Sequence, residues 1–544
     1  MLVTSPPPVP MEGAWTMRGF PAGAVYWSPH SYGYQLDGMA RAWVLRQMMI
    51  CWDLGTGKSH LGLAMLGLGF ETGEADLVLI VCKKNKLAEW MEDIGEFTTM
   101  AHQAALYHGP RRRKLLEGSP RILVTTYEAV RSDAVVPAGP RKKQLADGPL
   151  MGSLRGRRVI IIYDEIAKLG NRTTGLYKAH HYMVSQLRRE HPDMRIYGMT
   201  GTPIEKDWEN AFNEMRLIWP QGMPTVAGFE ELCVKKRVLI RTGPSRFSGY
   251  EMIRWKDEGT REFAAMCAPR LLRKRKTDKD VAAQFPARTE EYVKCGMRPD
   301  QAALYRKMED LAWDEETLEF QRVPGLGVML VLAAGHPRAL LRAAERGSSR
   351  LAVMLSETIG DEIARCSSAK TEMLADDYLD QIVRGQDGKA IVFTFFAETI
   401  LPVLRDELEK RNYPVFVYDG GPNSEKAKKD FRSFSGGAVL LSSDAGSDGI
   451  NVPEADYVIE YEPAREHSVR TQRFGRADRL GRTTPLTCFT FVLEGTVEES
   501  KIVPRTLERN EQQDVFLGDE DAEGHMSADE RREMFAIARR RRKA

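Results

Sequence analysis

The chain has 544 residues, of which 42% are hydrophobic, so it is too long for one ordinary domain and can fill more than one core. Its 78 basic and 76 acidic residues nearly cancel, which excludes a general polycation and requires any nucleic-acid site to be a local basic surface. The seven cysteines are scattered singly, and neither a bilayer-spanning apolar run nor a signal-peptide pattern occurs. We therefore expect a protein of a reducing compartment, the cytoplasm or the nucleoid of a host cell, that is not secreted and does not enter a membrane.

The first part of the chain is expected to be an extended arm followed by an α/β domain. Residues 1–30 are rich in Pro, Gly and aromatic residues, which is typical of an extended segment. Between residues 31 and 221, short apolar runs alternate with longer helical patterns, which predicts a parallel sheet buried on both faces. The apolar runs are LVLIV (77–81), ILVTTY (122–127) and VIIIYDE (159–165).

The second part repeats this pattern after an interruption. Residues 222–380 lose the alternation, and we expect them to form a mostly helical insertion and linker. Buried runs return over residues 381–505, so the simplest architecture is two similar α/β lobes with the helical insertion between their motifs. Residues 506–544 form a charged tail, which fits a solvated helix and a nucleic-acid contact equally well. The apolar runs of the second lobe are KAIVFTFF (389–396), PVFVYDG (414–420), AVLLSSD (438–444), YVIEYE (457–462) and LTCFTFV (486–492).

A glycine-rich segment, WDLGTGKS (52–59), lies between an apolar segment and a helical pattern, which is the context that a phosphate-binding loop requires. Its glycines would let backbone N–H groups surround the phosphates, Lys58 would place its charge on the β and γ groups, and Ser59 would bind Mg²⁺. Trp52 stands where the strict pattern has its first glycine. The residues that we predict to contact the nucleotide in this segment are Gly55, Thr56, Gly57, Lys58 and Ser59.

Two adjacent acids end a buried apolar run in RVIIIYDE (158–165). Asp164 would hold Mg²⁺ through water, and Glu165 would orient and deprotonate the water that attacks the γ-phosphate. A pair of surface acids in a loop is the simpler alternative. In a chain that also carries a phosphate-binding loop, however, the pair favours a nucleotide hydrolase with Ser59 and Asp164 as its metal ligands.

The order of these motifs resembles that of the Swi/Snf-type ATPases of helicase superfamily II, and the short chain outside the motor resembles compact phage and bacterial members. The resemblance covers about residues 30 to 500. It implies two RecA-like lobes that hydrolyse ATP between them while gripping nucleic acid. The segments that carry it, besides the two above, include VTTYE (124–128), MTGTP (199–203), LLSSDAGSDGIN (440–451) and QRFGRADRLGR (472–482).

The resemblance assigns roles to individual residues. Arg476 and Arg479 would be arginine fingers that reach the γ-phosphate when the lobes close, and Gln35 would read the adenine. Gly449 and Gln472 would complete the nucleotide contacts. Nucleic-acid contacts, or the coupling of the nucleic-acid track to ATP, would come from Thr125, Thr126, Thr200, Gly201, Thr202 and Ser443.

The sequence departs from the pattern of this family at four positions. In this family the acidic pair begins a four-residue DEAH-like box, which reads DEIA here (164–167). Ala167 stands where the family has a His, and it cannot make the contacts of that His to the MTGTP segment, the coupling motif. Asp444 and Asp448 add negative charge in the LLSSDAGSDGIN segment, which would disfavour a nearby phosphate. Asp478 replaces a His between the two arginine fingers.

Together these features predict a DNA-dependent ATPase that uses ATP and Mg²⁺ and tracks along double-stranded DNA without separating its strands. A monomer can contain the whole active site, and a protein partner could direct it to its target. Two alternatives stay open from the sequence. One is a strand-separating helicase on DNA or RNA, and the other is an ATP-gated nucleic-acid-binding scaffold with negligible turnover.

Overall fold

The computed structural model describes most of the chain, which divides into two compact units. Unit one consists of Met1–Val238, Met252–Ala283 and Gln512–Ala522, and unit two of Leu239–Glu251, Gln284–Glu511 and Glu523–Ala544. None of the helices in the described residues is both long enough and apolar enough to cross a membrane. The described residues are 25–26, 32–138, 144–204, 207–241, 249–311, 313–314, 319–320, 323, 325–444, 450–479, 482 and 484–517.

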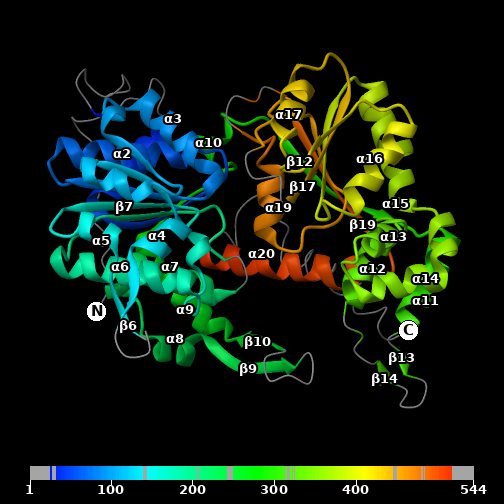
Figure 1. Ribbon diagram of the computed structural model, residues 1–544, viewed down its shortest axis with the longest axis horizontal. Helices are drawn as coiled ribbons and strands as arrows, with labels where there is room; N and C mark the ends of the chain where they lie inside the picture. Colours follow the sequence, from blue (N-terminus) through cyan, green and yellow to red (C-terminus); the bar gives the residue numbers. More distant parts are fainter. Residues whose placement is uncertain are drawn as a thin grey trace. The chain divides into compact units, whose positions relative to one another are not determined.

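Unit one is built on a parallel sheet (Figure 1). Its described strands lie in the order β11-β1-β8-β7-β2-β4-β3. The apolar runs predicted as strands are β2, β4 and β7, so this part of the fold prediction is confirmed. The strands are β1 (Gln47–Trp52), β2 (Leu77–Cys82), β3 (Ala104–Tyr107), β4 (Ile122–Thr126), β7 (Val159–Asp164), β8 (Ile196–Met199) and β11 (Leu271–Lys274).

Helices cover both faces of this sheet because successive residues of a strand point to opposite sides. Ile161 packs in a core shared with α4 to α9, whereas Ile162 faces α2 on the other side. A Cβ at Gly62 of α2 would lie 2.9 Å from the Trp90 ring, so α2 and α3 pack closely only because this residue is glycine. The helices are α1 (Gly33–Leu45), α2 (Lys58–Glu71), α3 (Leu87–Phe97), α4 (Tyr127–Asp133), α5 (Pro149–Leu154), α6 (Gly175–Glu190), α7 (Trp208–Ile218), α8 (Val226–Cys233), α9 (Asp257–Cys267) and α10 (Lys279–Ala282).

Unit two has a second parallel sheet, in the order β12-β19-β18-β15-β17-β16. All five apolar runs predicted for the second lobe are strands of this sheet, and the expected fold class of two α/β lobes is confirmed. The strands are β12 (Arg288–Cys295), β15 (Lys389–Thr394), β16 (Val415–Tyr418), β17 (Ala438–Ser443), β18 (Tyr457–Glu460) and β19 (Leu486–Leu493).

The two faces of the second sheet have separate cores. Val392 packs with the helices between residues 299 and 410, and Phe393 packs on the opposite face with Phe431 of α17 and Phe474 of α19. This alternation is that of strands covered on both sides. The helices are α11 (Pro299–Asp310), α12 (Leu326–Gly335), α13 (Ala339–Glu345), α14 (Arg350–Arg365), α15 (Ala369–Glu372), α16 (Ile400–Lys410), α17 (Ser424–Ser433), α19 (His467–Phe474) and α20 (Val503–Leu517), with the π-helical segments η8 (Met373–Gly385) and η9 (Glu498–Ile502).

The expected helical insertion at residues 222–380 also contains strands. β11 extends the sheet of unit one and β12 extends that of unit two. Both strands are rich in charged residues, which hides them from a search for apolar runs, because they lie at or near the sheet edge and are partly solvated. Short strand pairs complete the fold: β5 (Val135–Ala138) with β6 (Gln144–Asp147), β9 (Val234–Arg241) with β10 (Gly249–Trp255), and β13 (Trp313–Asp314) with β14 (Glu319–Phe320).

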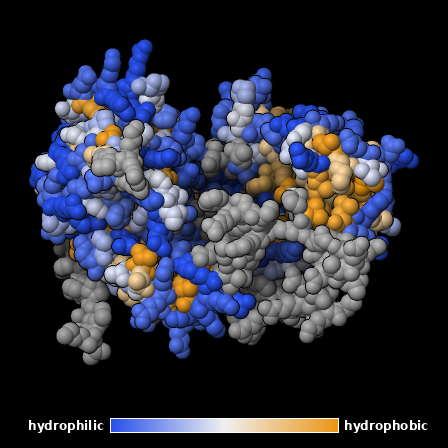
Figure 2. Space-filling view, turned by 60° about the horizontal axis from the view of Figure 1, so that its bottom comes forward, coloured by the Kyte–Doolittle hydropathy of each residue, from blue (hydrophilic) through white to orange (hydrophobic). Residues whose placement is uncertain are grey.

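The visible surface differs between the units. Figure 2 shows a face of unit one that is mostly hydrophilic, whereas apolar side chains gather on part of unit two. Val328 of α12 and Met354 of α14 are among the exposed apolar residues of unit two.

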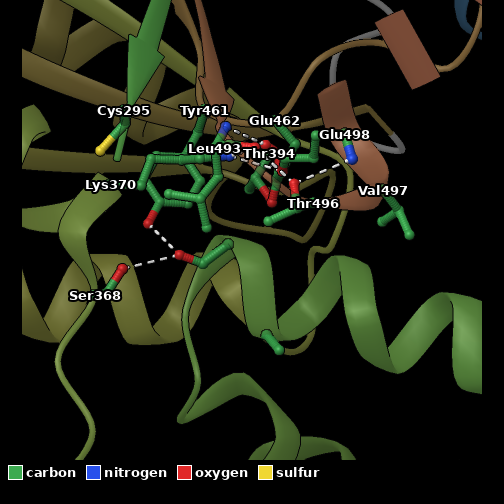
Figure 3. Close-up of polar contacts among 12 residues, drawn as sticks. Cys295, Ser368, Lys370, Thr394, Tyr461, Glu462, Leu493, Thr496, Val497 and Glu498 are labelled. Atoms are coloured by element: carbon green, nitrogen blue, oxygen red, sulfur yellow. Dashed lines mark hydrogen bonds and ion pairs between the residues drawn. The ribbon is translucent and has the colours of Figure 1, made fainter. Parts of the chain in front are cut away.

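A buried ion pair joins two segments of unit two (Figure 3). Lys370 Nζ of α15 lies 2.7 and 2.6 Å from the two carboxylate oxygens of Glu498, and both side chains are fully buried. Glu498 also accepts a hydrogen bond from the N–H of Leu493 at the end of β19. The ion pair holds α15 and the segment around Glu498 in one arrangement, because separating them would leave each buried charge without its partner, which is strongly unfavourable.

Replacing Lys370 by Met should leave Glu498 as an uncompensated buried charge. We expect Lys370→Met to lower the free energy of unfolding by about 3–5 kcal/mol. The double variant Lys370→Met, Glu498→Gln should recover most of this loss, since Gln keeps an acceptor for Leu493 without a charge. Urea unfolding measures both effects, and a double variant as unstable as the single one would contradict the argument.

Candidate functional site

Three motifs that are far apart in the sequence meet at one edge of the unit-one sheet. Strands β1, β8 and β7 are neighbours, so their carboxyl ends lie side by side. β1 leads into the glycine-rich loop, β7 ends at Asp164 and β8 leads into Thr200. Backbone bonds join the motifs, with Thr200 N donating to Ile50 O at 3.0 Å and Glu165 N to Met199 O at 2.9 Å. Ligands of parallel α/β sheets bind at such edges.

The glycine-rich loop needs its glycines. Gly55 and Gly57 have φ values of 82° and 93°, in the left-handed region that disfavours other residues. A Cβ at Gly57 would also collide with the Gln35 side-chain amide. Thr56 between them is buried and its hydroxyl donates to Asp53 O at 2.7 Å. The loop is therefore held in one curved conformation before any ligand binds.

Helix α1 braces this loop from one side. The Gln35 amide donates to Thr56 O at 3.1 Å, and the Tyr34 hydroxyl donates to the same oxygen at 2.8 Å. Gln35, which we predicted to read adenine, is thus a buried contact of the loop itself. Sequence reasoning missed Tyr34, because an aromatic residue beside a Gln gives no pattern that distinguishes it from a core residue.

Lys58 begins α2 at the mouth of the loop. Its ammonium donates to the carbonyls of Trp52 and Asp53 at 2.7 and 2.9 Å. Burial lowers the pKa of Lys58, while the carboxylates of Glu165, Asp53 and Asp164 act in the opposite direction and favour the charged form. The ammonium therefore stands in a small cluster of opposite charges. Ser59, the predicted metal ligand, follows in the first turn of α2.

Asp164 and Glu165 are held by different contacts. Burial raises the pKa of Asp164, and a hydrogen bond of 2.9 Å from Trp90 Nε1 to its Oδ2 opposes that shift. Glu165 has a φ of 65°, a strained conformation for a residue other than glycine, and Thr200 Oγ1 donates to its carboxylate at 3.4 Å. Residues in such conformations cluster at functional sites.

Two predicted nucleic-acid contacts are placed inside the unit. Thr125 is fully buried and its hydroxyl donates to Tyr107 O at 2.9 Å. Thr126 is nearly buried and caps α4 by accepting from Ala129 N at 3.1 Å. Neither hydroxyl faces solvent in this structure, and the nucleic-acid or coupling role of the two residues stays a prediction. Pattern matching gave their position in the chain but could not give the direction of their side chains.

The remaining coupling residues of unit one lie next to the glycine-rich loop. Thr202 N donates to Thr200 Oγ1 at 3.1 Å, and Gly201 lies against Leu54 and the Trp52 carbonyl. Ala167 is buried two residues after Glu165, in the short helix η5 (Ile166–Leu169). The turn after β8, which contains Thr200 to Thr202, therefore packs directly against the glycine-rich loop that follows β1.

In unit two, two departures from the family pattern are structural ion pairs. Arg473 of α19 binds Asp444 through two hydrogen bonds of 2.7 and 2.8 Å and also binds Glu460 at 2.9 Å. Asp478 accepts a hydrogen bond of 2.8 Å from Arg288 of β12. Arg473 thus offsets part of the Asp444 charge, and the expectation that Asp444 disfavours a nearby phosphate stays a prediction.

The predicted arginine fingers lie just after α19. Arg476 is buried, and Arg479 is half-buried with its Nε donating to Gly475 O at 3.1 Å. Gln472 is half-buried on α19, and Ser443 is fully buried at the end of β17. Gly449 and Asp448, for which we made predictions, lie outside the described residues.

The Trp90 indole should hold Asp164 in place. Removing it with Trp90→Phe leaves a half-buried carboxylate without its side-chain donor, and we expect the free energy of unfolding to fall by about 1–3 kcal/mol. Trp52→Phe is the matched control, because Trp52 is equally buried but its Nε1 has no hydrogen-bond partner among the described residues. Equal losses in urea unfolding would show that the indole serves only to fill space.

Comparison with known proteins gives two family models along the chain. The model described as "SNF2-related domain" matches residues 34–332, and "Helicase conserved C-terminal domain" matches residues 374–481. Among solved structures, the helicase domain of Pyrococcus furiosus Hef has a TM-score of 0.51 at 16% identity, and the match covers 86% of this chain and 96% of that one. This likeness supports the fold alone.

The curated relatives are much longer proteins. "Probable chromatin-remodeling complex ATPase chain" of Oryza sativa subsp. japonica is 23% identical, over 88% of this chain and 40% of that protein. "Chromodomain-helicase-DNA-binding protein 1-like" of Danio rerio is 26% identical, over 88% of this chain and 42% of that protein. The chain thus spans about two fifths of the length of these relatives. The model described as "SNF2-related domain" matches more than half of the residues of this chain. The chain therefore belongs to the SNF2-related family of helicase superfamily II.

Proposed function

We propose that this chain hydrolyses ATP and uses the free energy to move along double-stranded DNA, displacing bound proteins or remodelling structures without fully separating the strands. One observation carries the proposal: Lys58, Asp164 and Glu165 converge beside a loop with two left-handed glycines at the carboxyl edge of the unit-one sheet. Family membership supports it, since relatives of the chain are named as ATPases of chromatin-remodelling complexes.

ATP would bind through the backbone N–H groups of the loop and the Lys58 ammonium. In this structure Lys58 donates to the Trp52 and Asp53 carbonyls. On ATP binding it would exchange these neutral acceptors for phosphate oxygens, whose charge makes the hydrogen bonds stronger. Asp53 would stay in place, because Arg273 binds it at 2.7 Å and, against the effect of burial, holds its pKa at about 2.

The oxygen donors at this edge fit Mg²⁺, which takes few protein ligands and keeps several waters. Ser59 and Asp164 would hold the ion. Trp90 binds one carboxylate oxygen of Asp164 and so fixes the orientation of the other. When bound, Mg²⁺ neutralises charge that develops on the phosphates.

Glu165 is our candidate for the base that orients and deprotonates the attacking water. Its left-handed backbone and its contact with the Thr200 hydroxyl hold the carboxylate beside Lys58 rather than in a surface loop. Thr200 is the first threonine of the MTGTP segment (199–203), so a shift of that segment would move the Glu165 carboxylate directly. We propose that nucleic acid stimulates hydrolysis through this contact.

The arginine fingers are assigned to Arg476 and Arg479 of unit two. Five arginines lie on α19 or closely follow it: Arg470, Arg473, Arg476, Arg479 and Arg482. Arg470 forms ion pairs with Glu290 and Glu460. Arg473 is bound to Asp444 and Glu460, and Arg482 donates to four backbone carbonyl groups. In the family pattern, the arginines at the positions of Arg476 and Arg479 would stabilise charge on the γ-phosphate when the lobes close. Gln472 would contact the same nucleotide.

Stimulation of hydrolysis distinguishes the candidate functions. We propose to measure steady-state ATP turnover with no nucleic acid, single-stranded DNA, double-stranded DNA and RNA, with Lys58→Ala as control. Strong stimulation by double-stranded DNA is the expected result. A preference for a single strand or RNA would favour a strand-separating helicase, and the absence of Lys58-dependent turnover would favour an ATP-gated scaffold.

Replacing Glu165 by Gln should remove the base and keep the shape of the site. We expect kcat to fall by about a hundredfold to ten-thousandfold, with the Kd for ATP nearly unchanged. Exposed Glu117→Gln in η3 (Arg112–Gly118) is the matched control and should have no effect. Turnover that survives in Glu165→Gln while ATP binds normally would refute the assignment of the base.

Replacing Arg479 by Ala should slow hydrolysis far more than it weakens ATP binding. An arginine finger contributes about a thousandfold or more to kcat, because it acts on charge that develops in the transition state. Arg405→Ala removes an arginine that is 45% exposed on α16 and should leave kcat unchanged. Equal losses in kcat and in ATP affinity after Arg479→Ala would argue against the finger role.

A further inference from the structure

A cluster of cationic side chains, separate from the Lys58 site, surrounds a cavity in unit one. The cavity has a volume of about 220 Å³ and lies between the last turns of α6 and α7. Arg188, Arg189 and His181 reach it from α6, and Arg216 reaches it from α7. None of these residues belongs to the predicted nucleotide or nucleic-acid sites.

This cavity lies at the opposite edge of the sheet from the glycine-rich loop. Helix α6 follows the carboxyl end of β7 and leads back to the amino end of β8. Helix α7 runs in the same direction after β8. Their last turns therefore lie at the amino edge of a parallel sheet, whereas ATP would bind at the carboxyl edge. A ligand in the cavity would be separate from the ATP site.

The arginines around the cavity have no acidic partner among the residues that the structure describes in unit one. Within the described part of unit one, no carboxylate lies within ion-pair distance of Arg188, Arg189 or Arg216. Glu190, the acid next to Arg189 in the chain, is already bound by Arg155 and by the N–H of Gly156. The positive charge around the cavity is therefore not neutralised locally.

Among the arginines around the cavity, Arg188 is the one whose charged form is most disfavoured by burial. Burial lowers the pKa of its guanidinium to about 10. Its Nη2 donates to the carbonyls of Leu217 and Ile218 at 3.1 and 2.9 Å, but its Nε is buried without a hydrogen-bond partner among the described residues. A desolvated cation without a counter-ion is unfavourable, and an oxyanion beside it would offset that cost.

His181 reports the same positive potential. Partial burial lowers the pKa of its imidazole, and the charges of Arg216 and Arg188 lower it further. A lowered pKa favours the neutral ring, which can donate one hydrogen bond without adding a fourth charge.

Stabilisation of the helix ends explains only part of the cluster. Cations in the last turn of a helix interact favourably with its exposed carbonyls, and Arg188 does so with the end of α7. Arg216 instead extends over the Phe212 ring of its own helix, with 5.9 Å from the guanidinium carbon to the ring centroid. Arg189 donates to the Gln186 side chain at 3.3 Å. Helix-end stabilisation requires neither of these two residues to line a cavity.

We propose that this cavity binds a phosphate-class oxyanion, either free inorganic phosphate or a phosphate group of a nucleic-acid backbone. Several guanidinium groups can surround such an anion, and Arg matches the geometry of phosphate oxygens through paired hydrogen bonds. The volume accommodates one phosphate with some of its water and is below the range of about 300–1,000 Å³ typical of pockets for larger ligands. The proposal does not depend on the proposed ATPase activity.

Inorganic phosphate is the probe for this site. Calorimetric titration is carried out on the full chain carrying Lys58→Ala, which weakens phosphate binding at the glycine-rich loop. We expect phosphate to bind, and Arg189→Gln combined with Arg216→Gln to weaken its affinity about tenfold or more through the loss of charge-assisted hydrogen bonds. Arg131→Gln removes an exposed arginine of α4 and should leave the affinity unchanged.

Two further measurements make the result decisive. Arg216→Lys keeps the charge but not the paired hydrogen bonds, so its loss of affinity should be smaller than that of Arg216→Gln. Bound phosphate should raise the pKa of the His181 imidazole, which a histidine NMR titration assigned with His181→Gln would detect. No phosphate binding, or equal loss in the Arg131 and Arg189/Arg216 variants, would overturn the proposal.

Binding of duplex DNA identifies the source of the phosphate. If the cavity takes a backbone phosphate, Arg216→Gln should reduce the salt dependence of DNA affinity by about one ion per lost contact. If it takes free phosphate, DNA affinity and its salt dependence should stay unchanged while the phosphate titration is lost. Both outcomes uphold the oxyanion site, and they assign it to different ligands.

Discussion

The site in unit one depends on one electrostatic constraint, the partial burial of a lysine beside carboxylates at a single edge of the sheet. Burial disfavours the charged forms of Lys58 and Asp164, and their mutual attraction opposes this effect. Opposite charges can be held in this way only if the backbone places them accurately. The neighbouring strands β1, β8 and β7 supply that placement, and the left-handed conformation of Glu165 brings the second carboxylate into the group. The family resemblance alone does not supply this physical reason.

The same principle explains how unit two accommodates its unusual acids. Asp444 and Asp478 each form an ion pair with an arginine, which offsets part of the charge that each acid brings to its motif. The Arg473 side chain is nearly fully buried between Asp444 and Glu460 and fixes α19 against the ends of β17 and β18. The two acids therefore change the contacts that hold the LLSSDAGSDGIN and QRFGRADRLGR segments in place. Neither of them replaces Arg476 or Arg479, the predicted arginine fingers.

Much of the fold could be predicted because buried parallel strands are continuous apolar runs. The runs at 77–81 and 389–396 became β2 and β15 with bounds that differ by a residue or two. Strands with charged residues, such as β11 and β12, could not be recognised in this way. In the site, residue types and spacing located Lys58 and Asp164.

The contacts around those residues could not be read from the sequence. The Trp90 bond to Asp164 joins residues 74 positions apart. The hydroxyl directions of Thr125 and Thr126 depend on packing within the unit, which places both hydroxyls inside it. Motif matching thus finds which residues meet, whereas tertiary packing decides which of their atoms remain available to a ligand.

The central claim, that ATP turnover drives motion along duplex DNA, is tested most directly by displacement of a third DNA strand from a triplex. A motor that tracks along the duplex should release the labelled strand with ATP but not with a non-hydrolysable analogue, and Lys58→Ala should abolish the release. Release should not require separation of the duplex strands. If ATP is hydrolysed in a Lys58-dependent manner and the triplex stays intact on duplexes of any length, the chain is not a translocase and the account is wrong.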